Sequence, residues 1–157
     1  MSREPIFEDL VRMWDQRDPV PRGLVERMVA VATAEAAVAA TDLDYELMLL
    51  VERTTELAGT RGTMAYTLRF AAEGLDLLVR AGGSSGEAAT RLDGWIVPPG
   101  PVTVRASQVG GDERSWETEV DTRGRFELSD LPPGLYRLWL TPHEPDATAF
   151  GTPTFEI

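Results

Sequence analysis

The first forty residues repeat their apolar side chains with the period of amphipathic helices. Over residues 2–17 the apolar positions share one helical face at i, i+3 and i+4 spacing; they are Ile6, Phe7, Leu10, Val11 and Trp14. Ser2 is a suitable cap for the start of this helix. Residues 18–21 must leave it, because a residue before proline avoids the helical region. A second apolar stripe occupies residues 21–40. The sequence therefore predicts an N-terminal helical segment, residues 1–40, that contains two helices.

From residue 43 onward the apolar positions recur with a period of two, which indicates half-buried strands. Residues 43–53 are ambiguous. Their alternation favours a strand, whereas a helix continuing from residue 24 would bring Leu43, Leu47, Leu50 and Val51 together. We favour the strand, and we expect residues 41–157 to form a β domain.

Glycine and proline turns divide the rest of this region into short strands, a pattern typical of an all-β sandwich. Strands are expected at residues 65–70, 75–79, 91–97, 102–107 and 116–120, followed by strands on both sides of a Pro132–Gly134 turn. Asp121 and Gly124 suit the first and last positions of a tight turn. The tail, which carries Phe150, Phe155 and Ile157, is expected to be a closing edge strand. The residues predicted to form the core are Val102, Val104, Phe126, Leu128, Tyr136 and Leu138.

The C-terminal part of the chain carries a set of short motifs. They are Leu92-Asp93-Gly94-Trp95-Ile96, Val102-Thr103-Val104, Asp121-x-x-Gly124-x-Phe126 and Leu131-Pro132-Pro133-Gly134-x-Tyr136-x-Leu138. With them, residues 91–157 resemble the carboxypeptidase-regulatory-like domains of the transthyretin-like, Cna-B-like group. The resemblance implies an Ig/transthyretin-like antiparallel β-sandwich, here preceded by two α-helices. This group includes stalk modules, sugar-binding modules and passive companions of enzymes, so the fold alone does not give the function.

The charge of the chain is strongly negative. It has 26 acidic and 15 basic residues, a net charge of −11, and all the basic residues are arginine. Such a surface repels phosphate backbones, so we expect no nucleic-acid binding. It attracts a basic partner, or it serves solubility alone. The lack of lysine also excludes the isopeptide cross-link that Cna-B-type domains can carry.

The sequence gives no sign of export or of a membrane span. No apolar run approaches the roughly 20 residues of a membrane-spanning helix. The first residues have an acid and a proline where a signal peptide needs a basic start and an apolar core. There is no cysteine, which excludes disulfides and thiolate metal sites. We therefore expect a cytoplasmic protein without contact with a membrane.

The candidate catalytic and metal-binding residues have simpler structural explanations. His143 is the single histidine and stands between prolines, which favours an exposed loop over a general base. Asp121 is a candidate ligand of a calcium loop, but the segment around it lacks the regular acidic spacing of an EF-hand, and Asp121 already suits a turn. Glu117 and Glu119 share a strand face that is expected to be solvated. We expect no enzyme activity, no catalytic residue, no cofactor and no metal.

Three tryptophans offer an alternative function. Trp95, Trp116 and Trp139 fall in predicted strands, and two of them on one exposed face could stack on sugar rings, as in a carbohydrate-binding β-sandwich module. Trp139 is out of phase with Tyr136 and Leu138, so it is the best candidate for exposure. The competing interpretation, which we favour, is that Trp139 packs under the N-terminal helices.

A second resemblance concerns the junction between the helices. The run Asp18-Pro19-Val20-Pro21-x-Gly23-Leu24-Val25-Glu26-Arg27, followed by a β region, resembles small actinobacterial proteins encoded beside extracytoplasmic-function sigma factors. The resemblance implies a regulatory companion, with a basic sigma factor as a possible protein partner. The residues predicted to bind that partner are Phe7, Leu10, Val11 and Trp14 of the first helix. The alternative is that this face packs permanently on the β-sandwich.

Overall fold

The computed structural model describes residues 4–39, 44–58, 63–83, 89–110 and 114–157. Two helices come first, α1 (Glu4–Arg17) and α2 (Leu24–Ala39). The strands that follow are β1 (Tyr45–Leu47), β2 (Leu49–Ala58), β3 (Thr63–Ala72), β4 (Leu75–Gly83), β5 (Thr90–Val97), β6 (Val102–Val109), β7 (Ser115–Glu119), β8 (Arg125–Leu131), β9 (Leu135–Pro142), β10 (Ala149–Gly151) and β11 (Phe155–Glu156). The predicted helical ends at residues 2, 3 and 40 lie outside the described residues.

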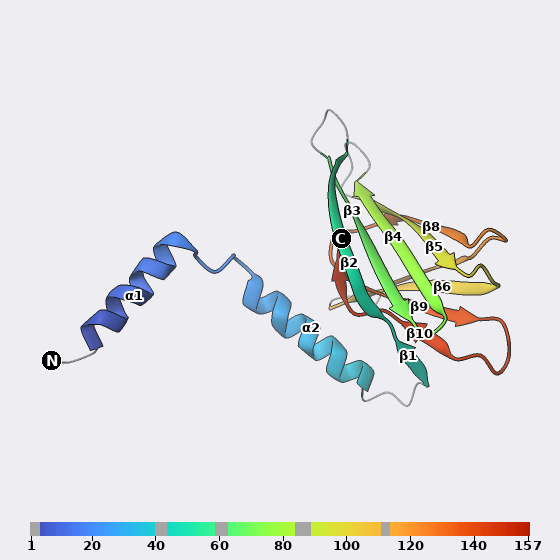
Figure 1. Ribbon diagram of the computed structural model, residues 1–157, viewed down its shortest axis with the longest axis horizontal. Helices are drawn as coiled ribbons and strands as arrows, with labels where there is room; N and C mark the ends of the chain where they lie inside the picture. Colours follow the sequence, from blue (N-terminus) through green and yellow to red (C-terminus); the bar gives the residue numbers. More distant parts are fainter. Residues whose placement is uncertain (1–3, 40–43, 59–62, 84–88, 111–113) are drawn as a thin grey trace.

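The strands form two sheets, and the chain is mainly β, as the period of its apolar residues predicted (Figure 1). Sheet A has the order β1-β10-β9-β6-β7, and β11 also pairs with β9. Sheet B has the order β2-β3-β4-β5-β8. Neighbouring strands are antiparallel except β1 and β10, which are parallel. Together the two sheets make the β body, which resembles a sandwich.

One hydrophobic core lies between the inner faces of the two sheets. All six predicted core residues are buried: Val102, Val104, Phe126, Leu128, Tyr136 and Leu138. Sheet B adds large side chains from β3, β4 and β5, such as Phe70, Leu77 and Ile96. The prediction succeeds because side chains of a strand alternate between its two faces, so a period of two identifies the inward set.

The tight turn at residues 121–124 is also confirmed. The backbone N–H of Gly124 donates to the carbonyl oxygen of Asp121 at 2.9 Å. One carboxylate oxygen of Asp121 accepts from the N–H groups of Arg123 and Arg125, each at 2.8 Å. Gly124 has a φ of +82°, and an added Cβ would lie 2.4 Å from the carbonyl oxygen of Ile96. Only glycine fits this position without strain.

Residues 45–53 are extended, which confirms the strand over the helix, but they do not form one strand. β1 pairs with β10 in sheet A, whereas β2 pairs with β3 in sheet B, and Met48 lies between them in the core. The chain therefore crosses from one sheet to the other at Met48. Because of this crossing and a bulge between Leu50 and Glu52, the alternating set of Leu47, Leu49 and Val51 is exposed rather than buried.

The expectation of a closing edge strand in the tail is wrong for β10. Sheet A places β10 between β9 and β1, with Phe150 opposite both Leu140 and Glu46. β1 takes the outer position because the segment after α2 pairs with the free side of β10. Farther along β9, β11 pairs with it, and Phe155 lies opposite Tyr136. The first strand of the β region, β1, is therefore the edge strand next to β10, which comes from the C-terminal part of the chain.

The helices occupy different positions relative to the β body. α2 lies near the outer face of sheet A, where its Glu35 contacts Arg137 of β9. α1 continues beyond α2 and points away from the two sheets (Figure 1). It ends at Arg17 because Asp18 precedes proline, and the Asp18 N–H makes a last bond to the carbonyl oxygen of Trp14 at 2.8 Å. The segment of residues 18–23 separates the two helical axes.

Candidate functional site

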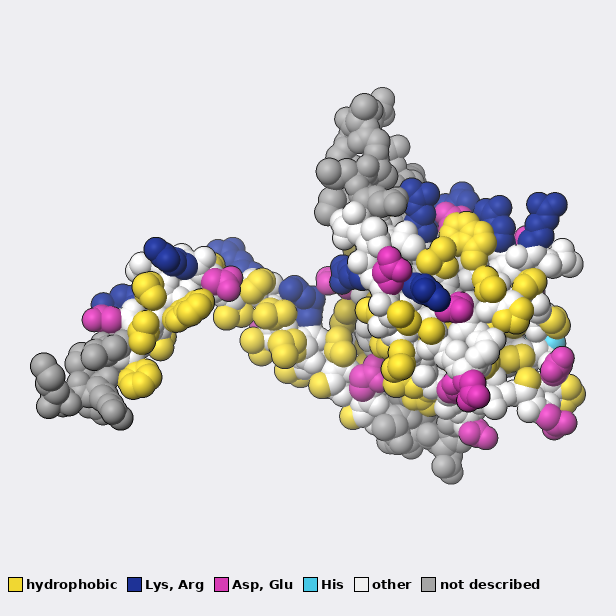
Figure 2. Space-filling model, in the orientation of Figure 1, with side chains coloured by type: hydrophobic (Ala, Val, Ile, Leu, Met, Phe, Trp, Pro, Cys, Tyr) yellow, Lys and Arg dark blue, Asp and Glu magenta, His cyan; other side chains and the backbone are white. Residues whose placement is uncertain are grey.

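α1 presents an apolar face that the β body does not cover. Phe7, Leu10, Val11 and Trp14 are 63%, 41%, 59% and 64% exposed. We call these four residues the docking face. Figure 2 shows hydrophobic side chains gathered along the helical arm, away from the two sheets. The residues predicted to bind a partner therefore lie together on one helix and are accessible.

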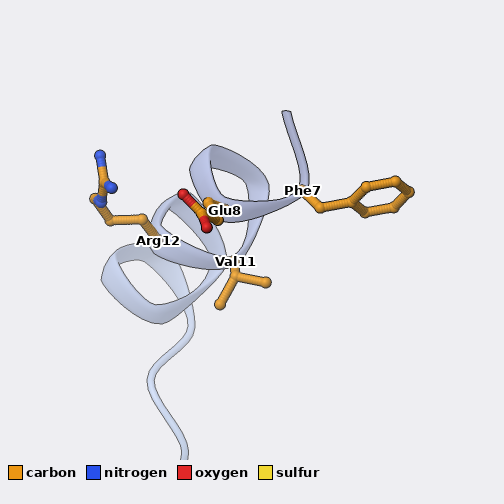
Figure 3. A pocket seen from close by; sticks show the side chains of 4 residues that line it. All are labelled: Phe7, Glu8, Val11 and Arg12. Carbon is orange, nitrogen blue, oxygen red and sulfur yellow. The ribbon is translucent and has the colours of Figure 1, made fainter. Parts of the chain in front are cut away.

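The docking face is bordered by charged side chains. A shallow, open hollow is lined by Phe7, Glu8, Val11 and Arg12. In Figure 3, Phe7 and Val11 project to one side of α1, whereas Glu8 and Arg12 lie toward the other. Arg12 pairs with Asp9 at 3.2 Å, and both side chains are well exposed. Such an exposed pair contributes little to stability, so the charges remain available to a partner.

α2 turns only part of its apolar stripe toward the β body. A groove of about 360 Å³ separates α2 from strands β9 and β11, and its lining residues are Arg27, Met28, Val31, Ala32, Leu135 and Glu156. Of the stripe expected from the sequence, Leu24, Val25, Met28, Val29 and Ala32, the side chains of Val25 and Val29 are exposed, whereas Met28 and Ala32 line this groove. The stripe was visible in the sequence, but the contact with sheet A was not, because Glu35 and its partner on β9 determine which side of α2 faces the sheet.

Arg137 is a residue that the sequence reasoning missed. It lies on β9 between the inward-facing Tyr136 and Leu138, so its side chain emerges on the outer face of sheet A, yet it is only 2% exposed. Nη2 of Arg137 is paired with a carboxylate oxygen of Glu35, and the Thr154 hydroxyl donates to the same oxygen at 3.1 Å. One feature of the sequence could have indicated it: Arg137 is two residues from Trp139, so both side chains lie on the same face of β9, and the opposite face is apolar.

The surroundings of Glu35 shift its acidity. Burial raises the pKa of Glu35, but the hydrogen bond and the charge of Arg137, with the hydrogen bond from Thr154, outweigh burial and hold the pKa below its usual range. At neutral pH the carboxylate of Glu35 is therefore ionised when α2 lies against the sheet.

The guanidinium of Arg137 also lies 5.5 Å from the centroid of the Trp139 ring.

The three strand tryptophans lie on different surfaces. Trp139 is half-buried and meets Tyr45 edge to face, with centroids 5.1 Å apart. Trp116 packs against the core next to Tyr136, at 5.8 Å. Trp95 lies on the outer face of sheet B under the guanidinium of Arg125. The structure thus does not bring two of them together as a platform for sugar rings.

His143 belongs to a hydrogen-bonded group on the surface of sheet A. Its Nε2 lies 2.9 Å from a carboxylate oxygen of Glu119 and 2.9 Å from the hydroxyl of Thr103, which itself donates to Glu119 at 2.8 Å. Glu119 therefore contacts both the hydroxyl of Thr103 and the ring of His143.

The acidic residues considered as metal ligands are separate or already engaged. Asp121 accepts the backbone bonds of its turn, and the bond from Arg125 is the first cause that holds its pKa below the usual range. Glu117 and Glu119 are exposed on β7. Within the described residues, no three histidine, cysteine or acidic side chains lie together as metal ligands.

Neither helix in the described part of the chain is long and apolar enough to cross a membrane. Comparison with protein-family models, with curated proteins and with solved structures finds no match.

Proposed function

We propose that this chain is a non-enzymatic, regulatory interaction protein that uses α1 to bind a basic protein in the cytoplasm. The observation that carries the proposal is the docking face: four large apolar side chains, two of them aromatic, on a helix that points away from the β body. Exposed apolar patches of this kind, bordered by charged residues, mark interaction sites. An amphipathic helix that enters the groove of a partner is a common form of recognition.

The energetics favour Phe7 and Trp14 as the anchors. Aromatic side chains often dominate the free energy of binding, and truncation of one can cost about 2 kcal/mol or more. Both are more than half exposed, so a partner has most of each side chain to bury. The proline-containing segment between the helices lets α1 change its angle to α2 as it docks.

Charge supports a basic partner. The net charge of −11 attracts a positively charged protein and speeds its association. Together with the resemblance of residues 18–27 to companions of extracytoplasmic-function sigma factors, this points to a sigma factor. The motifs of residues 91–157 further support an Ig/transthyretin-like classification for the β body, which serves as the scaffold.

The proposal is tested by calorimetric titration of the full chain with extracytoplasmic-function sigma factors of the same organism. Replacing Phe7, Val11 and Trp14 together by alanine should weaken binding by roughly 30-fold or more, the factor that corresponds to about 2 kcal/mol. A matched control replaces Val25 and Val29 of α2, two similarly exposed apolar residues. This control should keep its affinity. Equal affinity of the α1 variant and the wild type, or equal losses in both variants, contradicts the proposal.

A further inference from the structure

The contact between α2 and sheet A depends on few interactions. Besides the Glu35–Arg137 pair, Arg27 lies 3.9 Å from Glu156, and both of these side chains are substantially exposed. An exposed pair at this distance adds little. Val25 and Val29 are exposed, and Met28, Val31 and Ala32 line an open groove of about 360 Å³ between α2 and the sheet. The apolar side chains of α2 therefore bury only part of their surface against the sheet.

Arg137 provides the strongest link. A guanidinium that is 2% exposed needs a counter-charge, because an unpaired buried charge is very unfavourable. Glu35 of α2 supplies it, and Thr154 fixes the same carboxylate from the side of β11. If α2 leaves the sheet, Arg137 loses this carboxylate. The position of α2 and the neutralisation of Arg137 are thus linked.

The pairing uses only part of what the arginine offers. Nε and Nη1 of Arg137 are buried and make no hydrogen bond within the described residues. A guanidinium can hold a carboxylate through two parallel N–H bonds, whereas Glu35 is engaged through Nη2 alone. The flanking Trp139 ring and the Thr154 hydroxyl complete a small polar and aromatic site on the outer face of sheet A.

We propose that Arg137 is the centre of a carboxylate-binding site, that the chain's own Glu35 occupies this site, and that α2 is a strap held on sheet A chiefly by this interaction. Release of the strap exposes Arg137 and separates α2 from the β body. The site takes a carboxylate whatever protein α1 binds, so this inference does not depend on the proposed partner.

Hydrogen exchange of the full chain tests the strap. In a Glu35→Ala variant, the amides of residues 24–39 should exchange about tenfold or more faster, because their protection falls with the docked population. A Glu26→Ala variant removes another acid of α2, one on its exposed side, and should leave exchange unchanged. Amides of β6 and β9 should stay protected in both variants. Unchanged protection of α2 in Glu35→Ala overturns the proposal.

A second variant covers the case in which the uncompensated arginine unfolds the β body. The double replacement Glu35→Ala with Arg137→Met removes both charges and fills the site with an apolar side chain, which buried ion pairs generally tolerate. Exchange of residues 24–39 should again be fast while β6 and β9 remain protected. A slow α2 in this folded double variant means that other contacts hold the helix, and the strap is refuted.

Acetate tests whether the site recognises a carboxylate. In Glu35→Ala, sodium acetate should raise the melting temperature above that in sodium chloride at equal ionic strength, because acetate replaces the lost carboxylate. The wild type and the Glu35→Ala, Arg137→Met double variant should show no such difference. If acetate has no specific effect on Glu35→Ala, or acts equally on the double variant, Arg137 is not a carboxylate-binding site.

Discussion

Gly94 lies where the ring of Phe126 leaves no room for a side chain. It is in the middle of β5 and faces the core, directly opposite Phe126 of β8. A Cβ at this position would lie 2.0 Å from the nearest ring carbon. The phenylalanine therefore fills the space that a side chain at residue 94 would occupy, and the two residues act as one packing unit.

We expect Gly94→Ala to lower the free energy of unfolding by about 1–3 kcal/mol, the usual cost of overpacking a core. Combining it with Phe126→Leu should recover part of that loss, because the smaller side chain makes room. Gly82→Ala is the control, since no atom lies within 4 Å of its added Cβ. Chemical denaturation compares five proteins: the wild type, Gly94→Ala, Phe126→Leu, their combination and Gly82→Ala. Strict additivity of the two core changes would mean that residues 94 and 126 are not coupled.

Tyr66 links β3 to the end of the chain. Its hydroxyl donates to the carbonyl oxygen of Glu156, and Arg53 lies over its ring. Burial is the main cause that raises the pKa of Tyr66 to about 12; Glu156 adds to the rise and Arg53 opposes it. The folded chain thus keeps this proton at a pH where the unfolded chain has lost it.

We expect this difference to destabilise the fold in alkali. A tyrosine in the unfolded chain titrates near pH 10, so stability falls as the pH rises from about 10 to 12. Tyr66→Phe removes this contribution, and its stability should fall less over the same interval. Urea denaturation at a series of pH values measures both proteins. Parallel stability curves for the two would contradict the role given to Tyr66.

At the scale of elements, the pattern of apolar residues was enough to predict most strands and their faces. It could not predict the crossing at Met48, because alternation reports that a segment is extended and not which sheet it joins. It also could not predict the place of β10, since a parallel partner from residues 45–47 is a long-range choice. For the same reason Arg137 was missed: its burial depends on α2, which lies a hundred residues earlier in the chain.

The attachment of α2 should depend on acidity. Burial raises the pKa of Glu35, but Arg137 and Thr154 hold it below the usual range of a glutamate. A lowered pKa means that the stabilisation is complete above the ordinary glutamate value, about 4.3, and is lost as the pH falls through the lower folded value. Arg27 and Glu156 form a second, more exposed charged pair at this contact.

We therefore expect the amides of residues 24–39 to keep their protection from neutral pH to about pH 4.3 and to lose it in stronger acid, after correction for intrinsic exchange rates. Protonation of Glu35 removes its negative charge and so breaks the pair with Arg137. Glu35→Gln should show the reduced protection already at neutral pH. A wild-type α2 that remains equally protected at every pH at which the β body is folded would contradict this role of Glu35.

At the scale of the whole molecule, the hydrophobic core lies between the two sheets and, among the residues whose burial is described, includes no side chain of α1. Phe7, Leu10, Val11 and Trp14 are exposed, and Figure 1 shows that helix beyond the β body. The sequence was enough to place these four residues on one side of a helix, because the i, i+3, i+4 spacing identifies that side; their role in binding stays a prediction. The sequence left open whether that face packs on the sheets or stays free for a partner, because both kinds of helix show the same amphipathic pattern.

Thermal unfolding of the chain with and without residues 1–17 tests this separation of α1 from the core most directly. Because α1 buries none of its docking face against the sheets, we expect the melting temperature of residues 18–157 to equal that of the full chain within a degree or so; a loss of about 1 kcal/mol would shift it by about 2–8 °C. A melting temperature lowered by several degrees or more would show that α1 is part of the folded core, and would contradict its assignment as a docking arm.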